Sequence, residues 1–514
     1  MPRFAIAFTR ILLACACLPA YAAPGMTYVV TRFDDPVPNG CRLDDCSLRE
    51  AVSDAGRMPT QDAVLLAAGT YILKSTLVVH NSVSIFGVGA AATRITTTAS
   101  LNPAVQIDES FPMWFALHDL SLNASGGYEL RGLADSCITL EGVDLPNAAS
   151  KVWIADAQGC STTIAHSRVA GSMLIAGAIE TSISDSTFSK LTVLQANPGN
   201  STMYTAKIER VTVDGSAYTG SGVRIASVGD VTLADVTVRN TRYGLWFEEE
   251  TPSLLIDGLH YIANSEPLEI TKSALALIRD SEFVQNVALD GAAQPGALWV
   301  RGDNAIVQVI RSTFDRNRGT SNTGGAALVE NGSALVFNQS TFANNTFSAG
   351  IAASGPRGGA VGYRGSAGQT ILRLIGVTLV GPTVYATGID GTAVGGYGTQ
   401  SQAQVRIFNS IVHGSCATGI DLDHVEGSIS TGSNSCHFTS ATNQIGATTM
   451  QLALGALGDH GGPTPTFLPT PSSVAVDKGT DYGCLTVTSD QRGYARRIGR
   501  ACDVGAVETG SAAP

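Results

Sequence analysis

The sequence predicts an all-β protein built as a solenoid, in which successive coils of the chain stack on one another. The first observation is a six-residue unit that recurs along the chain, as at 183–188, 208–213 and 233–238. The second is the composition, because 56 glycines and only 6% aromatic residues indicate many tight turns around small side chains. The third is that only 15% of the residues are charged, which favours an extended β architecture over a compact α/β enzyme.

The repeat gives the length of one coil. Its last apolar residue recurs at steps of 19 to 37 residues, most of them near 23. Such a step is too short for a propeller blade and lacks the 3.6-residue period of a helix, but it suits one coil of parallel strands. The marker residues are Leu122, Leu145, Val169, Phe188, Val213, Val238, Tyr261, Phe283, Phe314, Phe342, Leu379 and Val412.

Each repeat unit contains a predicted corner. In Val231–Val238 the apolar residues alternate, slip by one position at Ala234-Asp235, and then alternate again. Because alternate residues of a strand face the same side, the slip indicates that the chain turns while both apolar sets stay inside. A left-handed corner favours Gly, Asn or Asp, and eight of the twelve corner positions carry one of them. The corner positions are Asp119, Gly142, His166, Asp185, Arg210, Asp235, Gly258, Asp280, Arg311, Gln339, Gly376 and Asn409.

The predicted dimensions follow from the coil count. A dozen coils of about 4.8 Å each would form a rod roughly 60 Å long. Cys137 and Cys160 are 23 residues apart, which is one coil, so stacking would bring their backbones within disulfide reach.

The chain begins with a predicted signal peptide, residues 1–22. Arg3 and Arg10 accompany an apolar run, Phe4–Leu18, which precedes small residues at Ala20-Tyr21-Ala22. The run is too short to span a membrane, and no later stretch is long and apolar enough. The mature chain is therefore expected to be soluble and secreted, with no membrane span. The alternatives are residence in the periplasm, or a lipoprotein of the outer membrane cleaved before Cys15.

The net charge and the cysteine content narrow the possible class of protein further. A net charge of −11 provides no electrostatic footprint for nucleic acid. No CxxC spacing occurs and the histidines do not cluster with the cysteines, so no metal site and no cofactor are predicted. An even number of cysteines in an exported chain argues for disulfides. The eight cysteines beyond residue 22 fall into four local pairs: Cys41 and Cys46, Cys137 and Cys160, Cys416 and Cys436, and Cys484 and Cys502.

Residues 23–75 are predicted to cap the first coil, whose floor would otherwise be exposed. Ser47 and Glu50 have the spacing of a capping box at the start of a helix. The helix is expected to end at Gly56, and a bridge between Cys41 and Cys46 would hold the loop before it. Leu48, Ala51, Val52 and Ala55 would form its apolar stripe. The segment 62–73 then leads into the β-helix body, assigned to residues 76–440.

Both ends of the mature chain resemble known families. The block Cys46-Ser-Leu-Arg-Glu-Ala51, followed by Ala68–Leu73, resembles the CSLREA domain of bacterial exported proteins. Residues 441–508 are similar to the choice-of-anchor Q domain that often closes such proteins. The motifs that carry this likeness are Gly461–Thr466, Ser473–Gly479, Asp490-Gln-Arg-Gly493 and Cys502–Ala506 with Glu508.

Short repeats between these ends resemble those of polymorphic outer-membrane proteins. They are of the GGA type, as at Gly358-Gly-Ala360, and of the FxxN type, as at Phe283–Asn286, Phe314–Asn317 and Phe342–Asn345. The resemblances imply a single-stranded right-handed parallel β-helix, similar to pectate lyases in fold, in families that mostly lack an assigned activity. Nothing after Glu508 resembles a sorting signal, so residues 509–514 are interpreted as a tail.

Motifs of β-helix enzymes do not fit this chain. Hydrolysis of a glycosidic bond needs two carboxylates about 5–9.5 Å apart. Polygalacturonases carry NTD and DD blocks on consecutive coils, but here there is no NTD and the DD pairs lie in the cap, at 34–35 and 44–45. Val152-Trp153-Ile154 is similar to part of a pectate lyase signature, but Ala155 and Asp156 replace its acid and histidine order. We interpret it as a core strand.

The best candidate for a groove is the segment 242–250. Its aromatic side chains could stack on sugar rings, and its acids could hold Ca²⁺ or act as catalysts. The alternative is structural, with Leu245 and Phe247 in the core and the acids on a solvated corner. Trp299 is either an exposed platform or a strand residue. The candidate binding residues are Arg242, Tyr243, Trp246, Glu248, Glu249, Glu250 and Trp299.

Two functions remain open at this point. The first is an exported, monomeric and non-catalytic β-helix that binds polysaccharide or a cell-surface glycan. The second is a polysaccharide lyase or glycoside hydrolase with an unrecognised site near Tyr243–Glu250. No acid is identified as catalytic by the sequence.

Overall fold

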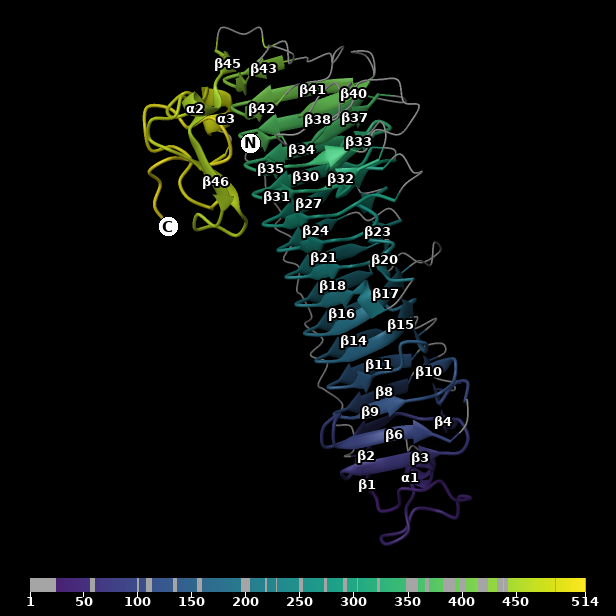
Figure 1. The fold of residues 1–514 in the computed structure, drawn as a ribbon. Coiled ribbons are helices and arrows are strands. Elements are labelled where there is room, and N and C mark those ends of the chain that lie inside the picture. Colours follow the sequence, from purple (N-terminus) through teal and green to yellow (C-terminus); the bar gives the residue numbers. More distant parts are fainter. Residues whose placement is uncertain are drawn as a thin grey trace, which may run out of the picture.

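The fold is a long stack of parallel strands with a smaller C-terminal segment folded back beside it (Figure 1). It is seen in a computed structural model of the full chain. Strands make up 51% of it and helices 5%, which confirms the predicted class, a right-handed parallel β-helix. The structure describes residues 25–513 except for the segments 56–60, 99–100, 108–112, 133–135, 155–159, 196–203, 218–219, 228, 249–252, 272–274, 290–293, 303, 321–323, 348–358, 366–368, 382–392, 398–402, 415–423, 432–437, 439–441 and 486.

The strands form three parallel stacks, which we name sheets I, II and III. Sheet I has sixteen strands in chain order, so at about 4.8 Å per strand it is roughly 70 Å long. Its strands are β1 (Thr27–Val30), β2 (Asp62–Leu66), β5 (Val83–Phe86), β8 (Met113–His118), β11 (Ser136–Glu141), β14 (Ser161–Ala165), β16 (Glu180–Ser184), β18 (Thr205–Glu209), β21 (Asp230–Ala234), β24 (Leu254–Asp257), β27 (Ala276–Arg279), β30 (Ile306–Ile310), β34 (Ala334–Asn338), β38 (Thr370–Ile375), β41 (Ala403–Phe408) and β43 (His424–Glu426).

Sheets II and III join into one network because two long strands, β15 (Arg168–Ala176) and β17 (Thr187–Gln195), run through both. The other strands of sheet II are β3 (Gly69–Leu73), β6 (Thr93–Thr97), β9 (Ser121–Asn123), β12 (Asp144–Leu145), β19 (Thr212–Asp214), β22 (Thr237–Arg239), β25 (His260–Ile262), β28 (Glu282–Val284), β31 (Thr313–Asp315), β35 (Thr341–Ala343), β39 (Thr378–Val380), β42 (Ile411–His413), β44 (Ile429–Thr431) and β45 (Gln444–Ala447). Those of sheet III are β4 (Leu77–Val79), β7 (Val105–Ile107), β10 (Tyr128–Gly132), β13 (Lys151–Ile154), β20 (Gly222–Ser227), β23 (Leu245–Phe247), β26 (Leu268–Ile270), β29 (Leu298–Val300), β33 (Ala327–Glu330), β37 (Val361–Arg364) and β40 (Val394–Tyr397).

The solenoid extends beyond the predicted dozen coils at both ends. Strands β1, β2 and β5 precede the first marker residue, and β43 follows the last. Since β1 pairs with β2 in parallel, strand stacking already starts inside residues 23–75, the segment assigned to the cap. The coils also carry three short elements that belong to none of the three sheets: η1 (Gly215–Ala217) and the pair β32 (Arg318–Gly319) and β36 (Thr346–Phe347).

The corners between sheets I and II lie where the slip in the pattern predicts them. All twelve predicted corner positions have positive φ, between 44° and 70°. A left-handed residue at this point turns the chain while the apolar residues on both sides of it stay inside. The prediction of the corner is therefore confirmed at each position, including His166 and Gln339, whose residue types do not favour it.

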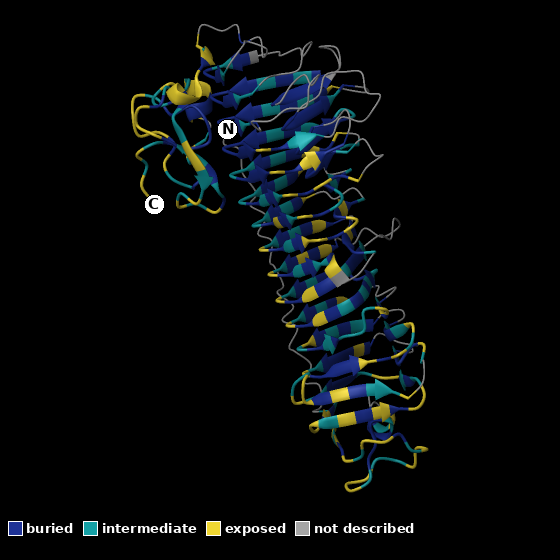
Figure 2. Cartoon of the chain, in the orientation of Figure 1, coloured by how far each residue is buried: buried dark blue, intermediate teal, exposed yellow. Residues whose placement is uncertain are grey.

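Apolar side chains fill the interior in columns, and buried residues, dark blue in Figure 2, recur on the strands along the whole stack. In sheet I, stacked residues one coil apart are all buried, and a pair such as Ile183 and Ile208 meets because β16 and β18 are in register. The column consists of Leu140, Ile164, Ile183, Ile208, Leu233, Ile256, Ile278, Val309, Phe337, Leu374 and Ile407.

The predicted helix covers the N-terminal end of the stack. It is α1 (Leu48–Asp54), and it begins with the expected reciprocal capping box between Ser47 and Glu50. Its predicted apolar stripe is buried in the core of the first coils. Arg49 binds Asp35 through two hydrogen bonds of 2.8 Å and ties the loop before the helix to it. Gly56, the expected helix end, lies outside the described residues.

Three of the four predicted cysteine pairs are disulfides in the structure: Cys41–Cys46, Cys137–Cys160 and Cys484–Cys502. The Cα atoms of Cys137 and Cys160 are 4.8 Å apart, as expected for neighbouring coils. The remaining pair, Cys416 and Cys436, lies outside the described residues. Disulfides of this kind indicate an exported protein. In the described part of the chain, no helix is long and apolar enough to cross a membrane.

The C-terminal segment lies beside the last coils and packs against sheet II (Figure 1). Gln491 is fully buried at this joint and hydrogen-bonds to threonines of β31 and β35. A small apolar cluster joins Ile411 and Ile429 of sheet II to Leu452 and Val504 of the segment. The elements of the segment are α2 (Thr449–Leu452), the antiparallel pair β46 (Leu454–Gly458) and β47 (Thr466–Pro469), and α3 (Asp481–Leu485).

Candidate functional site

Tyr243 and Trp246 present their rings on the outer face of sheet III. Leu245 and Phe247 of β23 are buried, whereas the Trp246 side chain between them points outward and is 37% exposed. Tyr243, just before the strand, is 50% exposed. The structure therefore combines both interpretations of this segment, because alternate residues serve the core and the surface.

A glycine fixes the bend that presents these two rings. Gly244 has a φ of +61°, and a Cβ added there would lie 2.2 Å from the hydroxyl of Tyr261. That hydroxyl donates a 2.6 Å hydrogen bond to the carbonyl of Glu266. A side chain at Gly244 would thus disturb both the bend and the neighbouring turn that carries Glu266.

The two rings line a groove of about 410 Å³ that crosses several coils. The outward residues Arg224, Trp246 and Glu269 are aligned in register on adjacent strands. The other polar or aromatic residues that line the groove are Lys190, Thr192, Tyr243, Glu266, Gln294 and Arg301.

Guanidinium groups flank the rings. The Arg224 guanidinium lies 5.7 Å from the centre of the Trp246 ring, and that of Arg242 lies 5.6 Å from the centre of the Tyr243 ring. Arg224 also forms an ion pair with Glu248. The groove can therefore offer flat apolar faces for stacking together with donors for hydroxyl or acidic groups.

Two carboxyl groups in the groove have raised pKa values. Burial raises the pKa of Glu269, although Arg301 donates a 2.6 Å hydrogen bond to it and opposes the shift. Burial also raises the pKa of Glu266, and the nearby Glu269 adds to the effect. Both groups therefore take up protons more readily than an exposed glutamate.

Trp299 does not present its ring to solvent, so it is not the exposed platform that was one of its two interpretations. It follows Glu269 in the same outward column, but only 7% of its surface is exposed. Arg301 covers it at 4.1 Å from the ring centre, and its indole nitrogen donates a hydrogen bond to Glu330. The ring packs because polar neighbours on both sides fold over it.

The predicted acid run is only partly described. Glu249 and Glu250 lie outside the described residues, and Glu248 is engaged by Arg224. Among the residues that the structure describes, no three His, Cys, Asp or Glu side chains lie together as a set of metal ligands. The Ca²⁺ suggestion therefore has no set of ligands in the described structure.

Sequence reasoning missed most of the groove. Lys190, Arg224, Glu269 and Arg301 belong to other coils and are joined to Trp246 only by stacking. A signal was available, because Arg224 and Glu269 stand 22 and 23 residues from Trp246, which is one coil in each direction. Combining the coil length with the aromatic segment would have found them.

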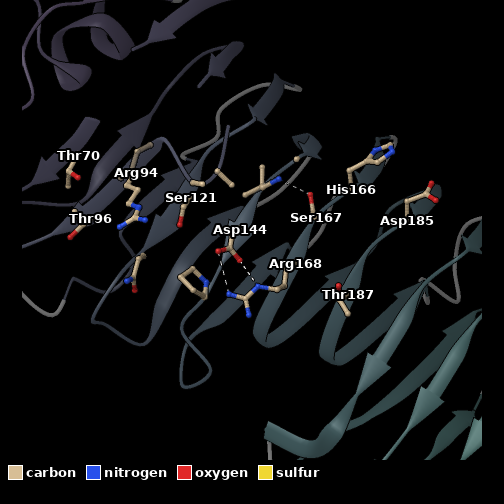
Figure 3. Close-up of a pocket in the computed structure, with 17 residues that line it drawn as sticks. Thr70, Arg94, Thr96, Ser121, Asp144, His166, Ser167, Arg168, Asp185 and Thr187 are labelled. Atoms are coloured by element: carbon tan, nitrogen blue, oxygen red, sulfur yellow. Dashed lines mark hydrogen bonds and ion pairs between the residues drawn. The ribbon is translucent and has the colours of Figure 1, made fainter. Parts of the chain in front are cut away.

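A second hollow, of about 770 Å³, lies on sheet II near the N-terminal end (Figure 3). Arg94 points into it, and an ion pair joins Asp144 to Arg168 with a distance of 2.8 Å. Its lining includes His166 but no Trp, Tyr or Phe. It therefore lacks the stacking surface that the Tyr243 and Trp246 groove provides.

No family model and no curated protein matches the chain. Among solved structures, it is similar to the catalytic domain of a GH87 alpha-1,3-glucanase, with 11% identity over 81% of this chain and 69% of that one and a TM-score of 0.35. It is also similar to pectate lyase Pel9A (13%, 95% and 97%, TM-score 0.23) and to the A-module of the Azotobacter vinelandii mannuronan C-5 epimerase AlgE6 (13%, 79% and 99%, TM-score 0.29). At these scores the likeness carries no argument about the site.

Proposed function

We propose that this protein is exported, carries the CSLREA-like and choice-of-anchor Q-like ends described above, and binds polysaccharide or a cell-surface glycan without cleaving it. The observation that carries the proposal is that two exposed rings, Tyr243 and Trp246, line one groove and each has a guanidinium group over it. Exposed aromatic faces bordered by hydrogen-bond donors suit sugar rings, which have apolar faces and polar edges.

The form of the groove supports binding of a chain rather than of a single small molecule. It is open and crosses the coils from Lys190 to Arg301. Arg224, Trp246 and Glu269 stand on paired strands, so these side chains lose little order when a ligand binds. The predicted signal peptide and the disulfides agree with a place outside the cytoplasm, either secreted or periplasmic, where such chains occur.

The test is glycan binding by matched tryptophan variants. The full-length mature protein is applied to a broad glycan array and to bacterial surface extracts, and Trp246→Ala is compared with Trp114→Ala. Trp114 is 56% exposed on β8 of sheet I, so it controls for the loss of a surface tryptophan. We expect Trp246→Ala to weaken binding at least ~10-fold, or about 1.4 kcal/mol, and Trp114→Ala to leave it unchanged.

The same incubations separate binding from cleavage. New reducing ends or unsaturated products should not appear if the groove only binds. Product formation that is lost in Glu266→Gln would instead favour the lyase or hydrolase alternative, since Glu266 is a proton-retaining acid of the groove. A folded protein that binds no glycan at all would contradict the proposal.

A further inference from the structure

The groove has a counterpart further along the outer face of sheet III. There Arg131 lies over Trp153, with 5.4 Å between the guanidinium and the ring centre. In the groove Arg224 lies over Trp246 at 5.7 Å. In both cases the arginine stands one coil before the tryptophan, 22 residues earlier in the chain, and is its direct partner in register.

Each arginine and tryptophan pair is accompanied by a tyrosine and a second cation. Lys151 lies 5.7 Å from the centre of the Tyr128 ring, which is in contact with Trp153. We name Tyr128, Arg131, Lys151 and Trp153 the first cluster. Arg224, Arg242, Tyr243 and Trp246 form the second cluster, in which Arg242 lies over Tyr243. The two clusters thus contain the same chemistry: two aromatic rings and two cations.

The clusters are aligned along the axis of the rod. Strand pairing places Trp153, Leu174, Thr192, Arg224 and Trp246 in one outward column, each directly above the last. Four strand steps of about 4.8 Å put the two tryptophans roughly 19 Å apart. Strands β10, β15, β17, β20 and β23, which carry or adjoin this column, follow one side of the rod in Figure 1. The repeat of an extended glycan is close to one strand spacing, so one chain can reach both.

Three cations on this face have no acid partner in the described part of the chain, unlike Arg224 and Arg301, which pair with Glu248 and Glu269. Arginines on the neighbouring face pair with acids one coil away, as Arg168 does with Asp144 and Arg210 with Asp185. By contrast, Arg131, Lys151 and Lys190 form no ion pair with any carboxylate of the described chain. In a protein of net charge −11, the described residues thus leave positive charge without an acid partner at the first cluster and on the coil between the clusters.

We propose that the two clusters are the ends of one track that holds an anionic glycan chain parallel to the rod. The inference rests on the proposed function and specifies its ligand: the aromatic rings hold sugar faces, and Arg131, Lys151 and Lys190 bind carboxylate or sulfate groups. Lys190, which also lines the groove, contacts the part of the chain between the two clusters.

The test uses chain length and matched arginine variants of the full-length mature protein. Labelled trisaccharides and octasaccharides of polygalacturonate carry carboxylates, those of heparin carry sulfates, and cello-oligosaccharides of the same lengths are neutral. We expect the octasaccharide of at least one anionic series to bind at least ~10-fold more tightly than its trisaccharide, because both clusters are engaged at once. Arg131→Gln and Trp153→Ala should remove this gain, because the octasaccharide can then engage only the second cluster. Arg168→Gln, the same charge change on sheet II, should have no effect.

The outcomes separate this inference from the proposed function. If Trp246→Ala weakens binding but Arg131→Gln does not change octasaccharide affinity, the groove binds glycan alone and the track is wrong. If neutral and anionic chains bind equally, the anionic ligand class is wrong. If no chain binds, the proposed function itself fails. Arg131→Gln keeps Trp153 in place, so it decides the matter even if Trp153→Ala does not fold.

Discussion

Individual residues at the corners show how the solenoid accommodates unfavourable backbone. Arg210 and Arg311 adopt φ values of 51° and 49°, in a region that costs an ordinary residue about 1 kcal/mol or more. Each is held there by the coil before it, because its guanidinium binds Asp185 or Asp280, the preceding corner residue. Stacking therefore imposes the corner, and the residue type at one position is less important than its neighbours.

Glu129 is a second residue in an unfavourable environment, because burial disfavours its charged carboxylate. It therefore gives a prediction about the pH dependence of stability. Its side chain is fully buried, and neither carboxylate oxygen has a hydrogen-bond partner among the described residues. Burial raises its pKa from 4.5 to about 7, although Ser150 and two nearby amides limit the shift. Since the folded state then holds the proton more tightly than the unfolded state, the free energy of unfolding should fall as pH rises from 4.5 to 7.

The variant Glu129→Gln tests this directly. The amide resembles the protonated acid, so the variant should match the wild type below pH 4.5 and exceed its unfolding free energy above pH 7, by up to ~3 kcal/mol. Urea unfolding at both ends of this range measures the difference. Glu180→Gln, at an exposed position of sheet I, should show no such dependence. A stability difference that does not change with pH would contradict the prediction.

At the scale of elements, the FxxN repeats become two internal ladders. Phe283, Phe314 and Phe342 stack face to face, with ring centres 4.4 and 4.7 Å apart. Three residues after each one, an asparagine is buried and accepts hydrogen bonds from the asparagine one coil before it. The ladder comprises Asn264, Asn286, Asn317 and Asn345. The three-residue spacing within each FxxN motif therefore corresponds to the step from the phenylalanine column to the asparagine column within one coil.

Replacing the middle of the asparagine ladder should destabilise the coils around it. The Asn317 side chain donates to the carbonyl of Phe283 at 2.8 Å and accepts from the amide of Asn286 at 3.1 Å. Asn317→Ala would leave these buried main-chain groups without partners, and we expect a loss of about 2–4 kcal/mol in unfolding free energy. Thermal or denaturant unfolding measures it. Asn123→Ala, at an exposed position of β9, is the control, and equal stability of the two variants would contradict the ladder's role.

At the scale of the whole molecule, the features that can be predicted from the sequence are those that recur with each coil. The marker residues and corners recur because each must stack on the next, so the β-helix, the twelve corners and the bridge between Cys137 and Cys160 could all be predicted. Outward residues are free of that constraint. Tyr243 and Trp246 were found because they are neighbours in sequence, whereas Arg224 and Glu269 lie one coil away and were missed.

The coil repeat also does not predict where the C-terminal segment packs. Its polar contacts with sheet II join residues far apart in sequence, about 150 residues for Thr341 and Gln491. Nothing in the spacing of the Asp490-Gln-Arg-Gly493 motif indicates its partner. In the structure Asp490 accepts hydrogen bonds from Arg492 and Tyr494, which shapes the loop that presents Gln491 to the solenoid.

This joint can be broken at one residue. The Gln491 amide donates to the hydroxyls of Thr313 and Thr464 at 2.9 and 3.0 Å and accepts from Thr341 at 2.6 Å. Gln491→Ala should therefore loosen the segment by about 2–4 kcal/mol, and hydrogen exchange should speed up in residues 464–508. The coils of sheet I should keep their protection, because their own ladder is untouched.

Gln308→Ala, on the outer side of β30, should change neither region. Glycan affinity should also be preserved, since the groove lies on sheet III and the joint on sheet II. Equal exchange in the wild type and Gln491→Ala would show that the apolar cluster around Leu452 and Val504 holds the segment without the glutamine.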